Sequence, residues 1–349
     1  MTRNLRKLAA VAVAGALLLP LASAPPSVAA KSARRPKFVD LDSVPKPKIT
    51  GAEIISGLEE LVDKYPARYS LPVLGPAPHN IAVSEFLADE AEGYGFKTRI
   101  LEFEGGSPAR TVRVVEAVKR GTKNPDEWIV FTAHYDTISR AGVTIQGAYD
   151  DGSGTNMLRY FGKAFSKIKT KRSIALVWFD AEESGLVASK LYADMLEEED
   201  QQIAAVLGFD MVGIGYPARY CICIFHGPAP EDALKGLPII DYVNFDYLKF
   251  PEGDGAPTAA ERWPFGKDPH VCSCGPNPRN SDEASLAAKG WFSMRWAGMR
   301  TAAEYPGYHQ PWDTVPFMEA VAGGRELLEQ GTENTFKSAY YSAFVVDNL

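Results

Sequence analysis

Seven residues that could bind a metal ion or move a proton are concentrated in a few short segments of the sequence. They are His134, Asp136, Asp150, Glu182, Glu183, Asp210 and, far downstream, His309. Imidazole nitrogens and carboxylate oxygens without a thiolate are the ligands of an open catalytic zinc site. A carboxylate that can bridge two ions, with another carboxylate nearby that binds neither, suits a two-metal hydrolase whose ions share a water. The residue types therefore predict metal-assisted hydrolysis.

Each of these residues has a simpler explanation when it is taken alone. An acidic residue at a strand end is usually a helix cap or a solvated loop residue. Nearby, Asp151 and Ser153 are both candidates for the role of helix cap. An isolated His134-x-Asp136 could be a structural histidine with its hydrogen-bond acceptor. The coincidence of so many such groups, in a chain with five histidines, favours a functional site.

Apolar runs predict the strands that position these residues. Trp128–Ala133, Ser173–Phe179 and Ile203–Phe209 lack alternation, which is typical of strands buried on both faces of a sheet. Apolar residues at helical spacing predict a helix from about Ser153 and another over Leu186–Glu197. The alternation predicts an α/β fold, a three-layer sandwich with a largely parallel, mixed central β-sheet flanked by helices. Ligands bind at the carboxyl ends of strands in such sheets, where the polar residues would meet.

Shorter elements are expected on either side of this core. A helix over His79 to about Glu92 precedes strands at Phe96–Phe103 and Thr111–Val118. Downstream, Asp282–Lys289 predicts a short helix, and alternating apolar residues predict a strand over 292–296.

The sequence divides into a leader, an arm and one enzyme-sized domain. Residues 1–30 have cations, an apolar run and then small residues, the layout of a secretory signal peptide with cleavage expected after Ala30. Residues 31–48, rich in Pro, Lys and Arg, indicate a linker or N-terminal arm, and 49–349 the catalytic domain. Within it, residues 227–278 contain nine prolines and predict an insertion over one face of the sheet.

The composition is that of an ordinary globular protein, with 46% hydrophobic and 23% charged residues and a formal net charge of −7. Loss of the three cations in residues 1–30 would take that charge to −10. An acidic protein is a poor partner for nucleic acid, whose phosphates favour a basic surface. The mature chain has no second long apolar run, and no cysteine directly follows the apolar run of the leader, so we expect a soluble, secreted protein without a membrane anchor.

Six motifs occur in a fixed order along the chain. They are His134-Tyr135-Asp136, Gly147–Gly154, Phe179–Gly185, Asp210–Gly213, Ser281-Asp282 and Tyr308–Thr314. In content and order they resemble the secreted co-catalytic two-zinc exopeptidases, which include the bacterial leucine-type aminopeptidases. The resemblance runs from about His79 to Thr314, with separations of 16, 33, 27 and 99 residues from position 134 through 150, 183 and 210 to 309.

The resemblance implies a zinc-aminopeptidase-like fold and a site for two Zn²⁺ ions, which other divalent metals could replace. Asp150 would bridge both ions. His134 and Asp210 would complete the coordination of one ion, and Glu183 and His309 that of the other.

The resemblance also implies the catalytic roles. Glu182 would be the general base, Asp136 would orient His134, and Tyr308 would donate a hydrogen bond to the tetrahedral intermediate. A cis peptide between Asp150 and Asp151 is expected for the same reason.

The expected activity is removal of N-terminal residues from peptides or proteins, since carboxylates around the site would suit an α-ammonium. A carboxypeptidase, a dipeptidase or a one-zinc glutaminyl cyclase on the same scaffold is the alternative, and an inactive metal-binding interaction protein is the non-enzyme alternative. A carboxypeptidase needs a cation, for which Arg279, Arg295 and Arg300 are candidates, although a surface salt bridge is the commoner role of such residues. Relatives often follow Ser-Asp with His and then Pro-Phe, whereas this chain has Glu283-Ala284, which puts substrate selection near Glu283 in doubt.

The four cysteines form two Cys-x-Cys pairs, Cys221 with Cys223 and Cys272 with Cys274. Export favours disulfides over a metal site, and a bridge within one Cys-x-Cys is strained. We therefore expect two bridges between the pairs, at the base of the Pro-rich insertion, with the pairing left open.

Overall fold

The computed structural model describes residues 37–71, 79–140, 142–215, 222–225, 233–250, 271–273, 281–297 and 305–349. The predicted signal peptide with its cleavage site after Ala30, and residues Cys221, Cys274, Arg279 and Arg300, lie outside these described residues. Within the described part of the chain, none of the helices combines the length and apolar character that crossing a bilayer requires.

A mixed sheet of eight strands runs through the described residues in the order β1-β2-β4-β3-β5-β8-β6-β7. The strands are β1 Lys97–Gly105, β2 Arg110–Lys119, β3 Asn124–His134, β4 Arg172–Phe179, β5 Gln202–Asp210, β6 Ile222–Phe225, β7 Val271–Ser273 and β8 Ser293–Ala297. The central strands β4, β3, β5 and β8 are parallel, whereas β1 and β2 are antiparallel to their neighbours and β6 is antiparallel to β8. The predicted largely parallel, mixed sheet is confirmed, and the parallel strands bring their carboxyl ends to one edge.

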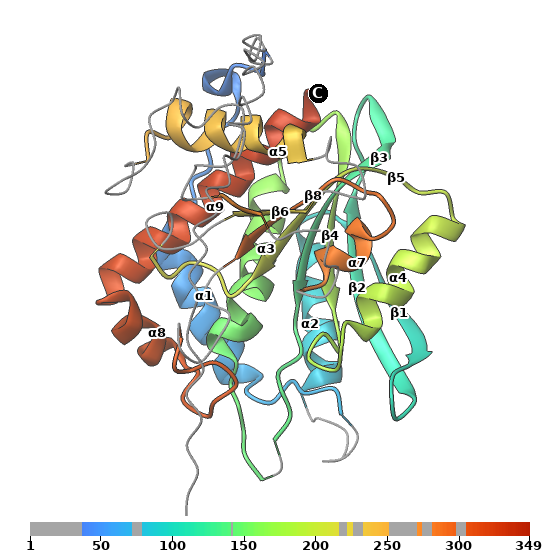
Figure 1. Ribbon diagram of the computed structural model, residues 1–349, viewed down its shortest axis with the longest axis vertical. Helices are drawn as coiled ribbons and strands as arrows, with labels where there is room; N and C mark the ends of the chain where they lie inside the picture. The colour runs from blue at the N-terminus through green and yellow to red at the C-terminus, as the bar shows by residue number, and fades with distance from the viewer. Residues whose placement is uncertain are drawn as a thin grey trace, which may run out of the picture. The chain divides into compact units, whose positions relative to one another are not determined.

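Helices cover both faces of this sheet (Figure 1). They are α1 Gly51–Lys64, α2 Asn80–Gly93, α3 Ser153–Phe165, α4 Val187–Glu198, α5 Ala233–Ile240, α7 Glu283–Ala287, α8 Val315–Ala322 and α9 Arg325–Asp347. Three short segments add single turns: η1 Leu41–Ser43, η3 Ala148–Gly152 and η4 Asp241–Tyr247.

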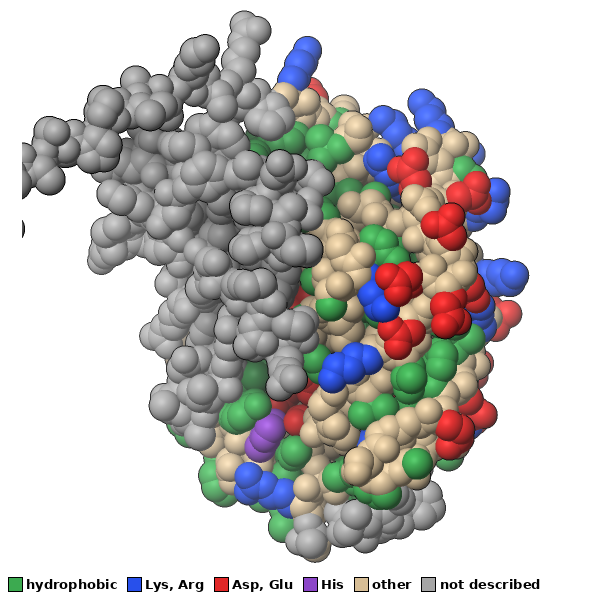
Figure 2. Space-filling view, turned by 45° about the vertical axis from the view of Figure 1, so that its right-hand side comes forward, with side chains coloured by type: hydrophobic (Ala, Val, Ile, Leu, Met, Phe, Trp, Pro, Cys, Tyr) green, Lys and Arg blue, Asp and Glu red, His purple; other side chains and the backbone are tan. Residues whose placement is uncertain are grey.

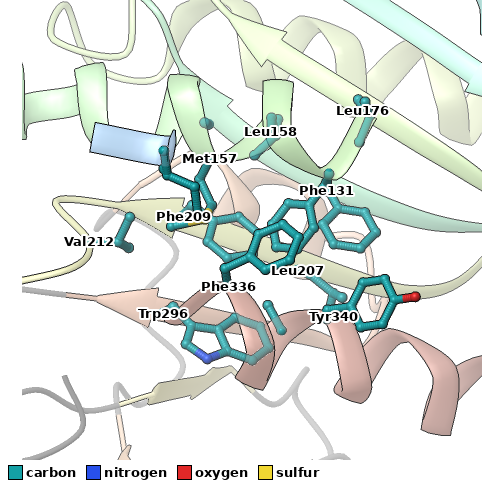
Figure 3. Packing of buried hydrophobic residues seen from close by; sticks show 14 of the residues in the cluster. Phe131, Met157, Leu158, Leu176, Leu207, Phe209, Val212, Trp296, Phe336 and Tyr340 are labelled. Carbon is teal, nitrogen blue, oxygen red and sulfur yellow. The ribbon is translucent and has the colours of Figure 1, made fainter. Parts of the chain in front are cut away.

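Alternate residues of each buried strand face opposite helical layers. Phe131 and Phe209 join the larger apolar core with α1, α3 and α9, where they pack near Phe336 (Figure 3). Phe336 in turn stacks on Phe161 at a centroid distance of 4.7 Å. Val130 and other intervening residues face the smaller core beneath α4 and α7. This double burial explains why the strands appear in the sequence as continuous apolar runs.

The N-terminal arm and the Pro-rich region contain ordered contacts. In the arm, Leu41 is fully buried, and the hydroxyl of Tyr340 in α9 donates a hydrogen bond to the carbonyl of Pro45. In the region where the sequence predicts an irregular insertion, residues 233–250 form α5 and η4, and the Ser338 hydroxyl of α9 donates to Asn244 Oδ1 at 2.7 Å. The described part of this region therefore packs against α9.

Candidate metal centre

The predicted ligands lie at the carboxyl ends of three central strands and on two loops beside them. His134 is the last residue of β3 and Asp210 the last of β5, while Glu183 follows β4. Asp150 lies in η3, directly before α3, and His309 lies between β8 and α8. The structure brings all five together, because two groups of three, His134–Asp150–Asp210 and Asp150–Glu183–His309, each hold their ligand atoms within 4.8 Å of one another.

Asp150 is common to both groups and directs one oxygen to each. Its Oδ1 lies 3.4 Å from His134 Nε2, and its Oδ2 lies 3.2 Å from His309 Nε2. Glu183 Oε2 lies 3.1 Å from the same His309 nitrogen, and Asp210 Oδ1 lies 4.0 Å from His134 Nε2. The geometry is that of two adjacent polar cavities that share one carboxylate.

Several atoms in these cavities have no hydrogen-bond partner. Glu183 Oε1 and Asp210 Oδ1 are buried and accept no hydrogen bond, and the neighbours of His309 Nε2 are the two carboxylate oxygens described above. A buried polar atom without a partner is costly, and most native structures avoid it. Divalent cations, one in each ligand group, would satisfy these atoms, and the nitrogen and oxygen donors suit zinc. The residues present therefore fit a metal centre.

The neighbouring carboxylates raise the pKa of both histidines. Burial by itself would lower the pKa of His309, but Asp150 and Glu183 outweigh it and raise that pKa to about 10. Burial likewise opposes protonation of His134, yet Glu182, Asp136 and Asp150 raise its pKa well above the ordinary value. Burial raises the pKa of Glu183 to about 7, and Asp150 adds to the rise. The site is a strongly negative pocket in low dielectric.

Glu182 lies beside the ligand groups without belonging to either. Its Oε2 is 4.0 Å from His134 Nε2, and its side chain is 16% exposed. Burial raises the pKa of Glu182 well above its ordinary value; His134 opposes this rise and Glu183 adds to it. A buried carboxylate with a raised pKa is a stronger base than an exposed one and can accept and return a proton.

Asp136 contacts His134, its predicted partner, and also a second part of the site. One carboxylate oxygen lies 3.4 Å from His134 Nδ1, and the Asp136 carbonyl lies 3.2 Å from the same nitrogen. The carboxylate also accepts hydrogen bonds from the backbone N–H groups of Glu182 and Glu183, at 3.0 and 3.3 Å. Asp136 thus ties the histidine of β3 to the loop after β4.

Tyr308 stacks on the ring of His309, with centroids 3.7 Å apart and an interplanar angle of 23°. Burial raises the pKa of the Tyr308 hydroxyl, and Asp150 and Glu183 add to the rise, so the phenol remains a hydrogen-bond donor. The side chain therefore lies at the ligand group that contains His309.

Two further carboxylates hold the loop that carries Asp150. Asp151, which the sequence suggested as a helix cap, accepts hydrogen bonds from the backbone N–H of Gly154 in the first turn of α3 and of Met211 directly after β5, at 2.8 and 3.2 Å. Asp313 accepts from the backbone N–H of Tyr149 and of Asp150 at 3.0 and 3.1 Å. Both residues lie within motifs that signalled the site. The expected cis peptide between Asp150 and Asp151 is present.

Arg68 is a further supporting residue that no sequence pattern indicated. It is fully buried, and its guanidinium donates to the carbonyls of Tyr65, Tyr135, Gln146 and Gly147 at 2.7 to 3.0 Å. It therefore joins the segment after α1 to the loops that follow β3.

The backbone is strained beside several ligands. Ala181, Met211 and His309 have φ values of 58°, 54° and 57°, in the left-handed region that non-glycine residues rarely adopt. Such strain persists only where surrounding contacts fix the chain, and it clusters at functional sites.

The surface salt-bridge role considered for Arg295 is wrong. Its side chain is 1% exposed, in β8 beneath the metal centre. Its Nε lies 3.4 Å from Glu283 Oε1 and its NH1 lies 3.8 Å from Asp210 Oδ2. A substrate carboxylate at the surface has no access to this guanidinium.

At the surface, the face shown in Figure 2 contains a histidine beside acidic side chains, while acidic and basic side chains are neighbours over much of the rest. The side chain of His309 is 22% exposed and that of Asp210 15% exposed, so the centre opens to solvent.

Comparison with solved structures defines the class of fold. The zinc aminopeptidase BSAP from Bacillus subtilis superposes with a TM-score of 0.64 at 12% identity, covering 85% of this chain and 96% of that one. A glutaminyl cyclase from an Acidobacteriales bacterium superposes with a TM-score of 0.61 at 18% identity, covering 86% and 98%. At these identities the likeness establishes the fold, which is that of the zinc aminopeptidases.

Sequence comparison indicates the family. Residues 113–251 match the model of peptidase family M28, and the match extends into the region predicted to be an insertion. Aminopeptidase YwaD of Bacillus subtilis is 24% identical over 225 residues, 63% of this chain and 42% of that protein. Aminopeptidase Y of Saccharomyces cerevisiae is 31% identical over 147 residues, 40% of this chain and 26% of that protein. The chain spans less than half the length of these curated relatives. Over residues 113–251 the chain is therefore similar to peptidase family M28.

Proposed function

We propose that the chain is a zinc-dependent exopeptidase that removes residues from the free N-terminus of peptides or proteins, with two zinc ions in the metal centre. The observation that carries the proposal is the sharing of Asp150 between two ligand groups, with Glu182 beside them as a carboxylate that belongs to neither. The relatives named as aminopeptidases and the zinc aminopeptidase fold support the same activity.

In this proposal His134, Asp150 and Asp210 hold one ion, and Asp150, Glu183 and His309 hold the other. When bound, the ions supply Lewis acidity and lower the pKa of a water at the site. Zinc is favoured by the donor set and by the relatives, and two ions rather than one are favoured by the two groups of ligands.

The protein's own residues would handle the protons. Glu182 accepts a proton from the attacking water and returns it to the departing amine. Asp136 keeps Glu182 in place through the backbone of the loop after β4. Tyr308, a neutral phenol beside His309, donates a hydrogen bond to the oxyanion that develops on the substrate carbonyl.

The negative pocket also suits the substrate's charge. Carboxylates around the centre attract the α-ammonium of a free N-terminus, which favours an aminopeptidase over a carboxypeptidase. Arg295 was the described candidate for binding a C-terminal carboxylate, and its burial removes it from that role.

The direct test is hydrolysis of aminoacyl-nitroanilides, N-blocked peptides and C-terminal-type substrates, before and after chelation and zinc replacement. We expect cleavage of free N-termini alone, loss on chelation and recovery with zinc. Glu182→Gln should lower kcat by about 10²- to 10⁴-fold while the bound metal is unchanged. The matched control is Glu102→Gln, in an exposed ion pair with Arg113, which should leave kcat unchanged.

Cleavage of N-blocked peptides from the other end would keep the metal centre but overturn the specificity. A second candidate is glutaminyl cyclase activity, because a glutaminyl cyclase shares the fold over 98% of its own length. Cyclisation of a peptide with N-terminal glutamine, without hydrolysis of any aminoacyl-nitroanilide, would favour that reading. Inertness toward all substrates with metal bound would favour a binding protein.

We also propose that the protein is exported and oxidised. The layout of residues 1–30 supports export. In the sheet, β6 and β7 pair so that Cys223 and Cys272 are opposite one another in the backbone register, which supports bridges between the two Cys-x-Cys pairs. Mass determination of the secreted form, with and without reduction, tests both expectations.

A further inference from the structure

A buried chain of charges runs from α7 through β8 to the metal centre. Glu283 and Arg295 are each 1% exposed, and Arg295 Nε lies 3.4 Å from Glu283 Oε1. The other side of the same guanidinium faces Asp210, with NH1 3.8 Å from Oδ2. Burying an arginine is costly unless its charge is compensated, and both carboxylates contribute to that compensation.

The sheet determines which way these side chains face. Gly208 of β5 is the register partner of Arg295 in β8, and Asp210 is two residues further along β5. Met294 and Trp296 face the larger core, so Arg295 faces the layer of α4 and α7, as Asp210 does. Asp210 and Arg295 therefore meet on one face of adjacent parallel strands.

Gly208 makes room for the third member of the chain. A Cβ at position 208 would lie 2.8 Å from Glu283 Oε2 and 2.9 Å from Glu283 Cβ and Cγ. The absence of a side chain on β5 thus lets Glu283 lie flat over the strand and reach Arg295. Glu283, the residue at which the chain departs from the motif of similar peptidases, therefore has a specific partner in Arg295.

We propose that Arg295, held in place by Glu283, is a positioning residue for the metal ligand Asp210. The guanidinium takes the Oδ2 side of the carboxylate, and Oδ1, buried and without a hydrogen-bond partner, is left to face His134 and the ion. Asp210 would then be held in one orientation that presents this oxygen to the ion. Outer partners that orient a metal ligand in this way affect metal affinity as well as activity.

The effect is specific to one half of the centre. Asp150, Glu183 and His309 form the other half, and among the described residues no lysine or arginine is within ion-pair distance of the two carboxylates in that group. The inference rests on the proposed metal centre and predicts that its two ions depend differently on Arg295.

The test is zinc titration of the full mature chain against a competing chelating dye, with stoichiometry from atomic absorption. For Arg295→Met we expect the affinity for one of the two ions to fall by about 10- to 100-fold and that for the other to stay constant. Cobalt replacement gives a second readout, since a changed ligand orientation alters the absorption spectrum of one ion. Arg295→Lys should recover part of the lost affinity.

Two milder variants keep the proposal testable if Arg295→Met does not fold. Glu283→Gln preserves shape, and Gly208→Ala displaces Glu283. Both should lower the affinity for the same ion as Arg295→Met does, but by a smaller factor. The matched control is Arg159→Met. Arg159 is a buried arginine outside the metal centre whose Nε lies 2.6 Å from Glu90 Oε2, and its loss should lower stability without changing the affinity for either ion.

Unchanged affinities in all folded Arg295, Glu283 and Gly208 variants would overturn the proposal and leave a purely structural ion pair. An equal loss of affinity for both ions in these variants would also overturn the proposal. Selective loss of affinity for one ion in the Arg295 variants of a protein that cleaves no peptide would refute the proposed activity while supporting the role of Arg295. A wild-type chain that binds no divalent ion would refute both.

Discussion

Carboxylates lie at both edges of the central sheet, but their charges are compensated in different ways. At and beside the amino end of the parallel strands, two carboxylates are each paired with an arginine: Glu116 with Arg99 and Glu127 with Arg172, both at 2.6 Å. Arg99 and Glu116 also line a cavity of about 360 Å³ together with Trp128. At the carboxyl end, Asp150 and Glu183 meet each other and two histidines.

The pKa values reflect this contrast. Arg172 lowers the pKa of Glu127, whereas burial and Asp150 raise the pKa of Glu183 to about 7. Local pairing makes the amino edge electrically complete, and its acidic residues stabilise the sheet. The carboxyl edge is incomplete without added positive charge, supplied by protons or by a metal ion. The same residue type therefore has a structural role at one edge and a functional one at the other.

The largest effect is expected when the carboxylate shared by the two ligand groups, that of Asp150, is removed. Asp150→Asn should abolish binding of both ions and lower kcat/KM by about 10³-fold or more, because both the Lewis acid and the activated water are lost. Metal content after dialysis and nitroanilide hydrolysis measure this. Retention of two ions would show that Asp150 is not shared.

Loosening the support of the site should have a smaller effect. Asp136→Asn leaves the ligands in place but weakens the contacts with His134 and with the backbone of Glu182. We expect a loss of about 10- to 100-fold in metal affinity or kcat. A chelator competition assay and steady-state kinetics check it, and unchanged values in both would contradict the role.

The pH dependence of stability should reverse the usual pattern when metal is removed. The pKa of Glu183 is raised to about 7 and that of Asp282 to about 8, both mainly by burial. Carboxyls whose folded pKa is raised stabilise the fold at acidic pH, and that contribution is lost as pH rises through 7 to 8. The contribution of His309, with a pKa of about 10, is lost at still higher pH.

We therefore expect the Tm of the chelated protein to fall between about pH 5 and pH 9, and excess zinc to oppose the fall, because a cation replaces the protons. Thermal melts in chelator and in zinc across this range measure the difference. A chelated protein that gains stability with rising pH would contradict the assignment.

The smallest effect should come from the amino edge. Glu116→Gln removes the charge from a buried carboxylate that binds Arg99 and the hydroxyl of Tyr192. We expect a loss of about 1 to 2 kcal/mol in the free energy of unfolding, since hydrogen bonds to charged groups are of that order. Metal stoichiometry should not change, and a loss of metal would refute the separation of the two edges.

The strands and the ligand positions were accessible from the sequence because they follow simple rules. Apolar runs located β3, β4 and β5 to within a few residues, and strand ends located His134 and Asp210. The helix α9 was not predicted. Its buried side includes Gly331, Thr335, Ser338 and Ser342, so it lacks a plain apolar stripe. Gly331 is required there because a Cβ would collide with the carbonyl of Gly213, a closeness that only the folded chain reveals.

Supporting residues were harder to recognise than ligands. Arg68 binds four backbone carbonyls that come together only after folding, and no pattern in residues 65–71 signals it. Arg295 was visible as a cation, but its burial against Glu283 depends on the register of β5 and β8. Sequence spacing indicates which atoms could bind a metal, whereas tertiary contacts determine what holds them.

The hydrogen bonds from Tyr149 and Asp150 to Asp313 have a consequence for biosynthesis. They join positions 164 and 163 residues apart, and the family-matched segment 113–251 contains neither Asp313 nor His309. A nascent chain that has emerged only through that segment has four of the five ligands but not the anchor of their central loop. Closing so long a loop must await the later residues. If the chain binds two ions as proposed, the group that contains His309 can be completed only after translation has passed that residue, and the loop that carries Asp150 gains its anchor only with Asp313.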